Sequence, residues 1–428
     1  MMQSGKKIYI VGIGGIGLSA LAQLYKHAGA EVSGSDRSEQ PTTKLLREKG
    51  IDIFIGHDAA NVPLDAGLLV YSDAIPEDNP ERARARELGI TEQSYFEALG
   101  QVANQKKVIA VAGAHGKTTT TAMLIDVLEA AGLDPAAVVG SLRAKSKSNF
   151  RAGDGEHFIV EADEFKRHFL NFNPFILIIT NIDADHLDYY RDIADIQSAF
   201  RELAQKVPQG GFVVCDVRDE KVLPVIEGLT CTVVDYRKYF DPELPLKALP
   251  LHRINAAAVL AVADILKISP STSLRALKEF SGTWRRFEYR GEMQNGALLY
   301  DDYAHHPVEI KATLKSAREK FPGKRIVIAF HPHLRSRTEA LFNDFVQAFT
   351  DADEIVLAPI FVAREEPDSA VSSELLAAKI RERGQKATAL GSLSEVAGYL
   401  VKNTRADDLV ITMGAGDIYT IMERLVAA

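Results

Sequence analysis

The sequence contains very little cysteine, and what it has forms no recognisable pattern. Its 428 residues include two cysteines, Cys215 and Cys231, and no CxxC motif. Without a secretory context, two isolated cysteines are expected to be reduced and structural, while a disulfide between them stays an alternative. A disulfide scaffold is therefore not the expected basis of the fold.

Export and membrane signals are also missing. The first residues, MMQSGKKIYIVGIGG, lack an apolar segment followed by a small-residue cleavage site. No apolar run reaches the ~20 residues that a bilayer-spanning helix requires. These absences predict a cytoplasmic protein without a membrane partner.

Positive charge is in deficit. Fifty lysines and arginines face 58 aspartates and glutamates, which gives a net charge of -8, and no long basic run occurs. Bulk electrostatics therefore predicts no nucleic-acid partner and no attraction to an anionic membrane. A protein of this kind that binds phosphates must gather positive charge locally, so the few basic residues inside motifs are informative.

Three successive blocks of alternating strands and helices predict an α/β protein of three domains. Each of the first two blocks opens with a short apolar strand, a glycine loop and a helical pattern, which is typical of parallel, doubly wound sheets. Helices of the third block are expected over Pro307–Lys320, over Arg337–Phe349 as one continuous helix, and over Ser372–Arg383. The predicted domains are an N-terminal Rossmann-like domain over 1–104, a central P-loop ATPase-type domain over 105–293 and a C-terminal Rossmann-like domain over 294–428.

Residues 113–121, GAHGKTTTT, follow a predicted strand and open a predicted helix. Glycines allow successive backbone N–H groups to face phosphates, and the helix N-terminus adds the positive end of its dipole. Lys117 would reach the β- and γ-phosphates, and the Thr118 hydroxyl would bind Mg²⁺. The pattern predicts an ATP site. A glycine-rich turn carrying a surface lysine is the competing interpretation.

A second glycine loop, GIGGIG at 12–17, fits G-x-G-x-x-G and has Asp36 about twenty residues further on. Alone, this pattern indicates a dinucleotide site and a nicotinamide-dependent oxidoreductase. That function leaves the separate ATP loop unexplained. A sugar nucleotide bound through its diphosphate and a turn that binds nothing are the alternatives.

Acidic residues and one histidine follow two further predicted strands. Glu161-Ala162-Asp163-Glu164 ends one strand, and TNIDADH (180–186) follows the next. The carboxyl ends of parallel strands are where open α/β sheets bind ligands, and carboxylate oxygens suit Mg²⁺. The sequence predicts metal binding here: Thr118 with Glu161 would hold one ion, and Glu161 or a neighbouring acid with His186 a second. Solvated loop carboxylates are the alternative.

Together these motifs resemble the Mur ligases, which build the peptide of bacterial cell-wall precursors. The resemblance rests on GAHGKTTTTAML, VEADE, TNIDADH, LPLHRINAA, GTWRRFEYRGE, DDYAHHPVEI and FHPHLRSRT, in this order. Other members carry a carbamylated lysine where this chain has Phe200 and Arg201, so it resembles the branch that adds the first amino acid. Three departures are Ala304 for glycine, His331 for glutamine and Leu334 for arginine.

The resemblance implies an ATP-dependent, amide-forming ligase. It would join L-alanine to the lactyl carboxylate of UDP-N-acetylmuramate through an acyl phosphate. The implied cofactors are ATP and Mg²⁺, one ion or two, with Mn²⁺ as a substitute, and the chain would be a monomer or a homodimer. A recycling ligase that adds a tripeptide, and a non-catalytic nucleotide-binding scaffold, stay alternatives.

The resemblance also implies the site residues. The expected catalytic residues are Lys117, Arg286, His306 and Arg337, with His306 as a candidate base. The expected ATP-binding residues are Gly113, Ala114, His115, Gly116, Lys117, Thr118, Thr119, Asn255, Arg286 and Asp302, with His252 near the adenine. The UDP-sugar would contact Gly12, Gly14, Gly15, Ile16, Gly17, Asp36, Ser72 and Asn79. The amino acid would contact His306, His333 and Arg337, and the metal Thr118, Glu161 and His186.

Overall fold

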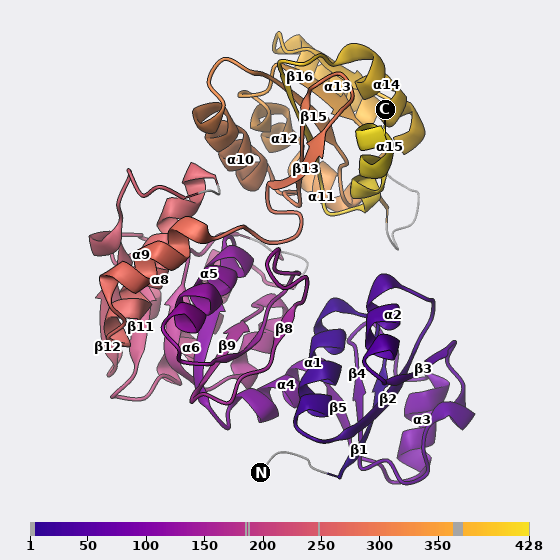
Figure 1. Cartoon of the computed structure of the whole chain (residues 1–428), viewed down its shortest axis with the longest axis vertical. Helices are drawn as coiled ribbons and strands as arrows, with labels where there is room; N and C mark the ends of the chain where they lie inside the picture. The colour runs from indigo at the N-terminus through magenta and orange to yellow at the C-terminus, as the bar shows by residue number, and fades with distance from the viewer. Residues whose placement is uncertain (1–4, 185, 187–188, 247–248, 363–370, 428) are drawn as a thin grey trace. The chain divides into compact units, whose positions relative to one another are not determined.

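The computed structural model describes residues 5–184, 186, 189–246, 249–362 and 371–427, and it contains three sheets. The chain divides into two compact units. The first contains residues 1–245 and 254–280, and the second contains 246–253 and 281–428. Elements are labelled in Figure 1.

The first sheet is a five-stranded parallel sheet in the order β3-β2-β1-β4-β5. Its strands are β1 (Lys7–Val11), β2 (Glu31–Asp36), β3 (Asp52–Ile55), β4 (Leu68–Tyr71) and β5 (Glu92–Ser94). Its helices are α1 (Ile16–His27), α2 (Pro41–Glu48), α3 (Pro80–Glu87) and α4 (Tyr95–Ala103). Successive side chains of β1 enter two different hydrophobic clusters, because a strand alternates its side chains between faces.

The second sheet has seven strands in the order β12-β11-β10-β6-β9-β7-β8, and only β8 is antiparallel to its neighbour. Its strands are β6 (Lys107–Ala112), β7 (Ala136–Val138), β8 (Phe150–Arg151), β9 (His157–Glu161), β10 (Pro174–Ile179), β11 (Phe212–Cys215) and β12 (Thr232–Asp235). Helical segments of this part are α5 (Lys117–Ala130), η2 (Phe165–Asn171), α6 (Ile193–Gln205), α7 (Leu223–Ile226), η3 (Tyr236–Tyr239), α8 (Arg253–Ile265) and α9 (Pro270–Glu279). Side chains of the first two sheets share one hydrophobic cluster, which explains why both belong to one unit.

The third sheet has six strands in the order β13-β14-β18-β15-β16-β17, with β13 antiparallel at one edge. Its strands are β13 (Glu288–Glu292), β14 (Leu298–Asp302), β15 (Arg325–Phe330), β16 (Glu354–Leu357), β17 (Ala387–Ala389) and β18 (Asp408–Met413). Its helices are α10 (Pro307–Lys320), α11 (Arg335–Ala340), α12 (Phe342–Ala348), α13 (Ser373–Glu382), α14 (Leu393–Asn403) and α15 (Met422–Ala427). Ile326, Ile328 and Phe330 of β15 pack on one face, and Val327 and Ala329 pack on the other.

The predicted α/β class with three sheets is confirmed. The single helix expected over Arg337–Phe349 is wrong, because Leu341 separates α11 from α12. The domain boundaries at 104/105 and 293/294 stay predictions; strand β13, within 281–293, pairs with the third sheet. Among the described residues, no helix is both long and apolar enough to pass through a bilayer.

Candidate active site

The phosphate loop lies between β6 and α5, where the sequence predicts it. Gly113 and Gly116 have φ values of 131° and 84°, which L side chains rarely adopt. A Cβ on Gly113 would lie 2.1 Å from Oγ1 of Thr180, and one on Gly116 would lie 2.7 Å from Oδ1 of Asn255. These two glycines are therefore required by both conformation and space.

The strand beside the loop holds its backbone in place. The His115 N–H donates to Oδ1 of Asn181 over 2.9 Å, and Nδ2 of Asn181 donates to the His115 carbonyl, also over 2.9 Å. The Thr180 hydroxyl donates to the same carbonyl over 2.7 Å. Because Thr180 and Asn181 directly follow β10, the loop conformation is set by the neighbouring strand.

Lys117 lies beside buried carboxylates. Its Nζ is 2.8 Å and 2.9 Å from the two oxygens of Glu164, and it also donates to the Gly113 carbonyl over 2.5 Å. Burial acts to lower the pKa of Lys117, but the charges of Glu164, Asp163 and Glu161 outweigh burial and raise it. The side chain is therefore a fixed cation at the phosphate loop.

The predicted metal ligands fall into two neighbouring groups. The Thr118 hydroxyl donates to Oε1 of Glu161 over 2.8 Å, and the Gly140 N–H donates to Oε2 over 2.8 Å. His186 lies instead with Asp163 and Glu164, in a group whose ligand atoms are all within 4.8 Å of one another. The expectation that Glu161 or a neighbouring acid accompanies His186 left the partner open, and the acids found beside it are Asp163 and Glu164 of the run after β9. Carboxylate oxygens with one imidazole nitrogen form a donor set that fits Mg²⁺ or Mn²⁺.

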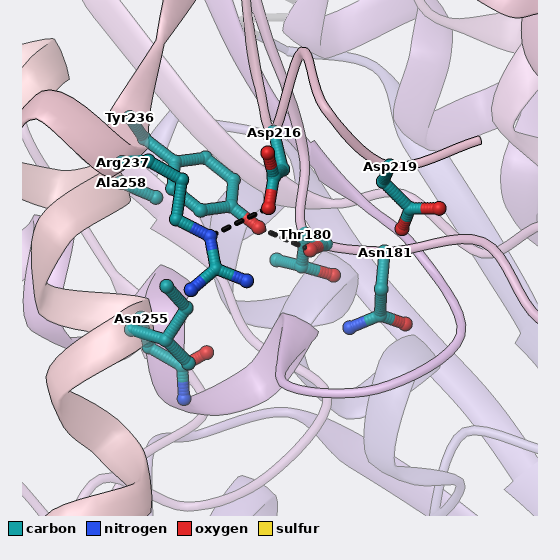
Figure 2. Close-up of a pocket in the computed structure, with 9 residues that line it drawn as sticks. Thr180, Asn181, Asp216, Asp219, Tyr236, Arg237, Asn255 and Ala258 are labelled. Atoms are coloured by element: carbon teal, nitrogen blue, oxygen red, sulfur yellow. Dashed lines mark hydrogen bonds and ion pairs between the residues drawn. The ribbon is translucent and has the colours of Figure 1, made fainter. Parts of the chain in front are cut away.

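A cavity of about 180 Å³ adjoins the loop (Figure 2). Figure 2 shows the Tyr236 ring beside Arg237, with Asn255 below them. The Tyr236 hydroxyl donates to the Thr180 carbonyl over 2.8 Å, and Nε of Arg237 donates to Oδ2 of Asp216 over 2.5 Å. The cavity is lined by Thr180, Asn181, Asp216, Asp219, Tyr236, Arg237, Ile254, Asn255 and Ala258.

Only Asn255 of that cavity was singled out from the sequence. Asp216 directly follows β11, and Tyr236 and Arg237 directly follow β12. Both strands lie in the sheet that carries the loop, so the rule that ligands bind at the carboxyl ends of parallel strands would have found these residues. His252, expected near the adenine, is a buried residue of the other unit.

In the first glycine loop, GIGGIG, Asp36 serves the loop itself. The Gly14 N–H donates to its Oδ2 over 2.9 Å, and Nε2 of Gln40 donates to its Oδ1 over 3.2 Å. A Cβ on Gly14 would lie 2.7 Å from that same Oδ2, and one on Gly17 would lie 2.6 Å from the Tyr95 ring. The glycines are thus explained by close packing, while contact of Asp36 with a nucleotide stays a prediction.

The other predicted uridine-side residues lie after β4. Ser72 accepts a 3.3 Å hydrogen bond from the Ala74 N–H. Asn79 is buried and caps α3, since its side-chain oxygen accepts from the N–H groups of Glu81 and Arg82 over 3.0 and 3.3 Å. The cap accounts for Asn79 without a ligand, and its role as a substrate contact stays a prediction.

In the second unit, the adjacent residues Arg285 and Arg286 differ in burial and in their contacts. Arg285 is fully buried: its Nε lies 2.7 Å from Oδ2 of Asp301, and its other nitrogens donate to the carbonyls of Gly414 and Gly416. Arg286 is half-buried, and its guanidinium lies 5.2 Å from the Tyr303 ring centroid. Arg285 is therefore part of the fold, which leaves Arg286 as the arginine able to meet a ligand.

Asp302 is buried and braces the same turn. Its two oxygens accept from the N–H groups of Phe287 and Ala304 over 2.7 and 2.8 Å. Burial raises the pKa of Asp302 to about 6, against the opposing charge of Arg286. The carboxylate is thus linked to Arg286 electrostatically.

The two histidines before α10, His305 and His306, make different contacts. His306 is the N-cap of α10, and its Nδ1 accepts from the Val308 N–H over 3.4 Å. His305 lies with its ring centroid 6.2 Å from that of His333, and Nδ1 of His333 is 3.4 Å from a guanidinium nitrogen of Arg337. The structure thus groups His305, His333 and Arg337. Pro307 at the first helical position was the sequence signal that would have assigned His306 to the cap.

Comparison with family models identifies the class of protein. A model described as "Mur ligase family, catalytic domain" matches residues 7–107, "Mur ligase middle domain" matches 111–241, and "Mur ligase, glutamate ligase domain" matches 285–416. The chain therefore belongs to the Mur ligase family.

Individual relatives narrow the resemblance within the family. The chain is 40% identical to the UDP-N-acetylmuramate–L-alanine ligase of Clostridium novyi, over 100% of this chain and 99% of that protein. The crystal structure of the UDP-N-acetylmuramate–alanine ligase of Thermotoga maritima is 30% identical, with a TM-score of 0.81 and 98% of each chain covered. A murein peptide ligase of Psychrobacter arcticus, 24% identical, shares the fold with a TM-score of 0.71 over 99% of this chain and 98% of that one.

Proposed function

We propose that this chain uses ATP to join the amine of L-alanine to the lactyl carboxylate of UDP-N-acetylmuramate, as an amide-forming ligase of peptidoglycan precursor synthesis. The observation that carries the proposal is the loop in which Lys117 and Thr118 each meet a carboxylate, Glu164 and Glu161. It stands in a chain 40% identical, over its whole length, to an L-alanine ligase.

The reaction needs two displacements. A lactyl carboxylate oxygen attacks the γ-phosphorus of ATP, the bond to the β-phosphate oxygen breaks, and ADP leaves with the electron pair. The neutral amine of L-alanine then attacks the carbonyl carbon of the acyl phosphate, inorganic phosphate leaves, and the amine loses a proton. The first step brings two anions together, so a fixed cation such as Lys117 stabilises the charge of the transition state.

A divalent cation completes the charge balance. We assign one Mg²⁺, or two, with Mn²⁺ as a substitute, to Glu161 with Thr118 and to His186 with Asp163 and Glu164. When bound, the cation neutralises phosphate oxygens and orients them. Hydrogen bonds from Thr118, Gly140 and Lys117 orient the carboxylates of Glu161 and Glu164.

The two nucleotides are assigned to different loops. The cavity beside Asn255 and Tyr236 would hold the adenosine of ATP, because it adjoins Gly116 of the phosphate loop. The GIGGIG loop at the N-terminus of α1 would hold the diphosphate of UDP-N-acetylmuramate. A second diphosphate loop in a chain that already has an ATP loop fits a sugar nucleotide better than a redox cofactor.

The second unit would bind the acceptor and the transferring phosphate. Arg337 beside His333 suits the carboxylate of L-alanine, since a guanidinium pairs with a carboxylate in a planar, bidentate manner. Arg286 is assigned to the γ-phosphate. His305 lies beside His333 and is our candidate to receive the amine proton.

The test measures inorganic phosphate release with ATP, Mg²⁺ and UDP-N-acetylmuramate while the acceptor is varied among L-alanine, glycine, L-serine and the cell-wall tripeptide. We expect the highest kcat/KM with L-alanine and formation of the UDP-sugar–alanine product by mass spectrometry. Turnover with the tripeptide alone would refute the proposal. Hydride transfer to a nicotinamide cofactor without ATP consumption would refute it as well.

A further inference from the structure

His168 is a residue of the second sheet's part whose side chain contacts residues of the first sheet's part. Neither glycine loop accounts for this contact. Nε2 of His168 lies 2.7 Å from Oδ2 of Asp73, in the segment after β4 that also carries Ser72. Its ring stacks on Phe96 of α4, with centroids 4.0 Å apart and an interplanar angle of 14°. His168 itself belongs to η2, after β9, so it reaches from the ATP-binding part to the part assigned to the UDP-sugar.

The other edge of the same ring faces the acidic run beside Lys117. Nδ1 of His168 lies 3.8 Å from Oδ2 of Asp163, and the next residue, Glu164, is the partner of Lys117. The ring of Phe165 lies 6.0 Å from His168 and 4.9 Å from His186. One imidazole thus stands between the loop at Asp73 and the carboxylates of the phosphate site.

The backbone before His168 adopts an uncommon conformation. Lys166 and Arg167 have φ values of 50° and 60°, in the left-handed region that is costly for residues with a Cβ. Arg167 is held there by ion pairs to Asp195 and Glu202 at 2.9 and 3.1 Å. Its N–H donates to the Glu164 carbonyl over 2.9 Å.

Several contacts together fix the backbone conformation of the turn at residues 163–169. The Phe169 N–H, directly after His168, donates to the Asp163 carbonyl over 2.9 Å. Strained, overdetermined backbone of this kind is concentrated at functional sites, where it aims a side chain. Here the side chain that it aims is the imidazole between Asp163 and Asp73.

We infer that His168 is a positioning residue for the transfer step: it holds the segment around Ser72 and Asp73 at a fixed distance from the phosphate loop. The lactyl carboxylate of a sugar nucleotide bound to the first sheet then meets the γ-phosphate in line. The inference rests on the proposed function. Misplacement of about 1 Å in such a reaction costs roughly a hundredfold in rate, so a rigid contact at this point has kinetic consequences.

The experiment compares His168→Ala, His168→Gln and Asp73→Asn with a matched control, His27→Ala. His27 also faces an aspartate across the same two parts, with Nε2 3.9 Å from Asp154, but it is half-exposed and far from Lys117 in the sequence. We expect kcat to fall about tenfold or more in His168→Ala, within the cost of misplacement. The KM values for UDP-N-acetylmuramate and ATP should change by less than about threefold. His168→Gln, which keeps an N–H donor for Asp73, should recover part of kcat.

Hydrogen exchange gives a second readout that does not depend on turnover. Amides of residues 72–78 should exchange faster in His168→Ala and Asp73→Asn, and at the wild-type rate in His27→Ala. A kcat for both His168→Ala and Asp73→Asn within twofold of wild type would overturn the inference, whatever the exchange rates. An equal loss of kcat in His27→Ala would overturn it too. Absence of wild-type turnover with every acceptor would count against the proposed function instead.

Discussion

The two units of this protein use their sequence motifs in different ways. In the first unit, the motif GAHGKT forms the site with its own consecutive residues, and Lys117 and Thr118 face the carboxylates after β9. In the second unit, RRFE and DDYAHHP supply side chains to the fold as well as to the site, since Arg285 is buried in it and His306 caps α10. A motif can therefore supply side chains to the fold as well as to a candidate site, as Arg285 and His306 do.

The largest expected effect concerns the phosphate loop. Lys117→Ala should reduce kcat by roughly 10²–10³-fold, because it removes a fixed charge aimed at the transferring phosphate. Binding of UDP-N-acetylmuramate, measured by calorimetry, should stay within about twofold of wild type. The matched control is Lys107→Ala, since Lys107 lies at the exposed start of β6 and pairs with Glu156. Normal turnover in Lys117→Ala would remove the basis for assigning ATP to this loop.

The arginine pair tests the second unit with adjacent residues. Arg286→Ala should lower kcat by about a hundredfold, as loss of a phosphate-stabilising group does, while the thermal midpoint stays close to wild type. Arg285→Ala should instead destabilise the unit by about 3–5 kcal/mol, because Asp301 is left buried without its partner. Thermal unfolding and steady-state kinetics of both variants distinguish a loss of activity from a loss of stability. The interpretation is wrong if Arg286→Ala unfolds the unit while Arg285→Ala loses only activity.

The buried His252, near Arg286, makes the free energy of unfolding depend on pH. Burial, with the charges of Arg286 and Lys320, lowers the pKa of His252 to about 3. Since the folded pKa lies below the unfolded value, the stabilisation is complete above about pH 6.5 and is lost as the pH falls through 6.5 towards 3. Between pH 7 and pH 5 the loss is about 2 kcal/mol for this one group.

His252→Gln should remove that part of the pH dependence. Unfolding curves at pH 7 and pH 5 measure it, with His27→Gln as an exposed control. An unchanged difference between the two pH values in His252→Gln would show that other groups cause the acid sensitivity.

The smallest expected effect separates the two histidines before α10. His305→Asn should raise the KM for L-alanine about tenfold, or about 1.4 kcal/mol, because His305 lies beside His333 and Arg337. His306→Asn should change it less, since asparagine is also a good N-cap residue. Initial rates at varied L-alanine concentration make the comparison. A larger loss in His306→Asn would restore His306 as the candidate base.

The sequence predicted the local arrangement of candidate site residues where those residues are close together in the chain. Gly113, Gly116, Lys117 and Thr118 are consecutive or nearly so, and the backbone of a strand–loop–helix junction presents them together. The three α/β blocks were equally readable, because strands buried on both faces are continuous apolar runs. The break at Leu341 was not, since no glycine or proline marks it in the sequence.

Residues that meet only through folding were harder to predict. The sequence left open whether His186 meets Glu161 or a neighbouring acid. It lies with Asp163 and Glu164, because the path of the chain after β10 decides which carboxylate it meets. Asp216, Tyr236 and Arg237 come from strands whose order in the sheet is not written in the sequence. His168 resembles any polar residue of a loop until its contacts with Asp73 and Phe96 are seen.

The sequence by itself determined the family, the phosphate loop and the α/β class, because these depend on local backbone geometry and on the periodicity of apolar side chains. The resemblance pointed to Arg286, but only the tertiary structure showed that its neighbour Arg285 is buried in the fold and that His306 caps α10. Neighbouring side chains in a turn point in different directions. The one that turns inward, as Arg285 does towards Asp301, is used by the fold, and the other is left for chemistry.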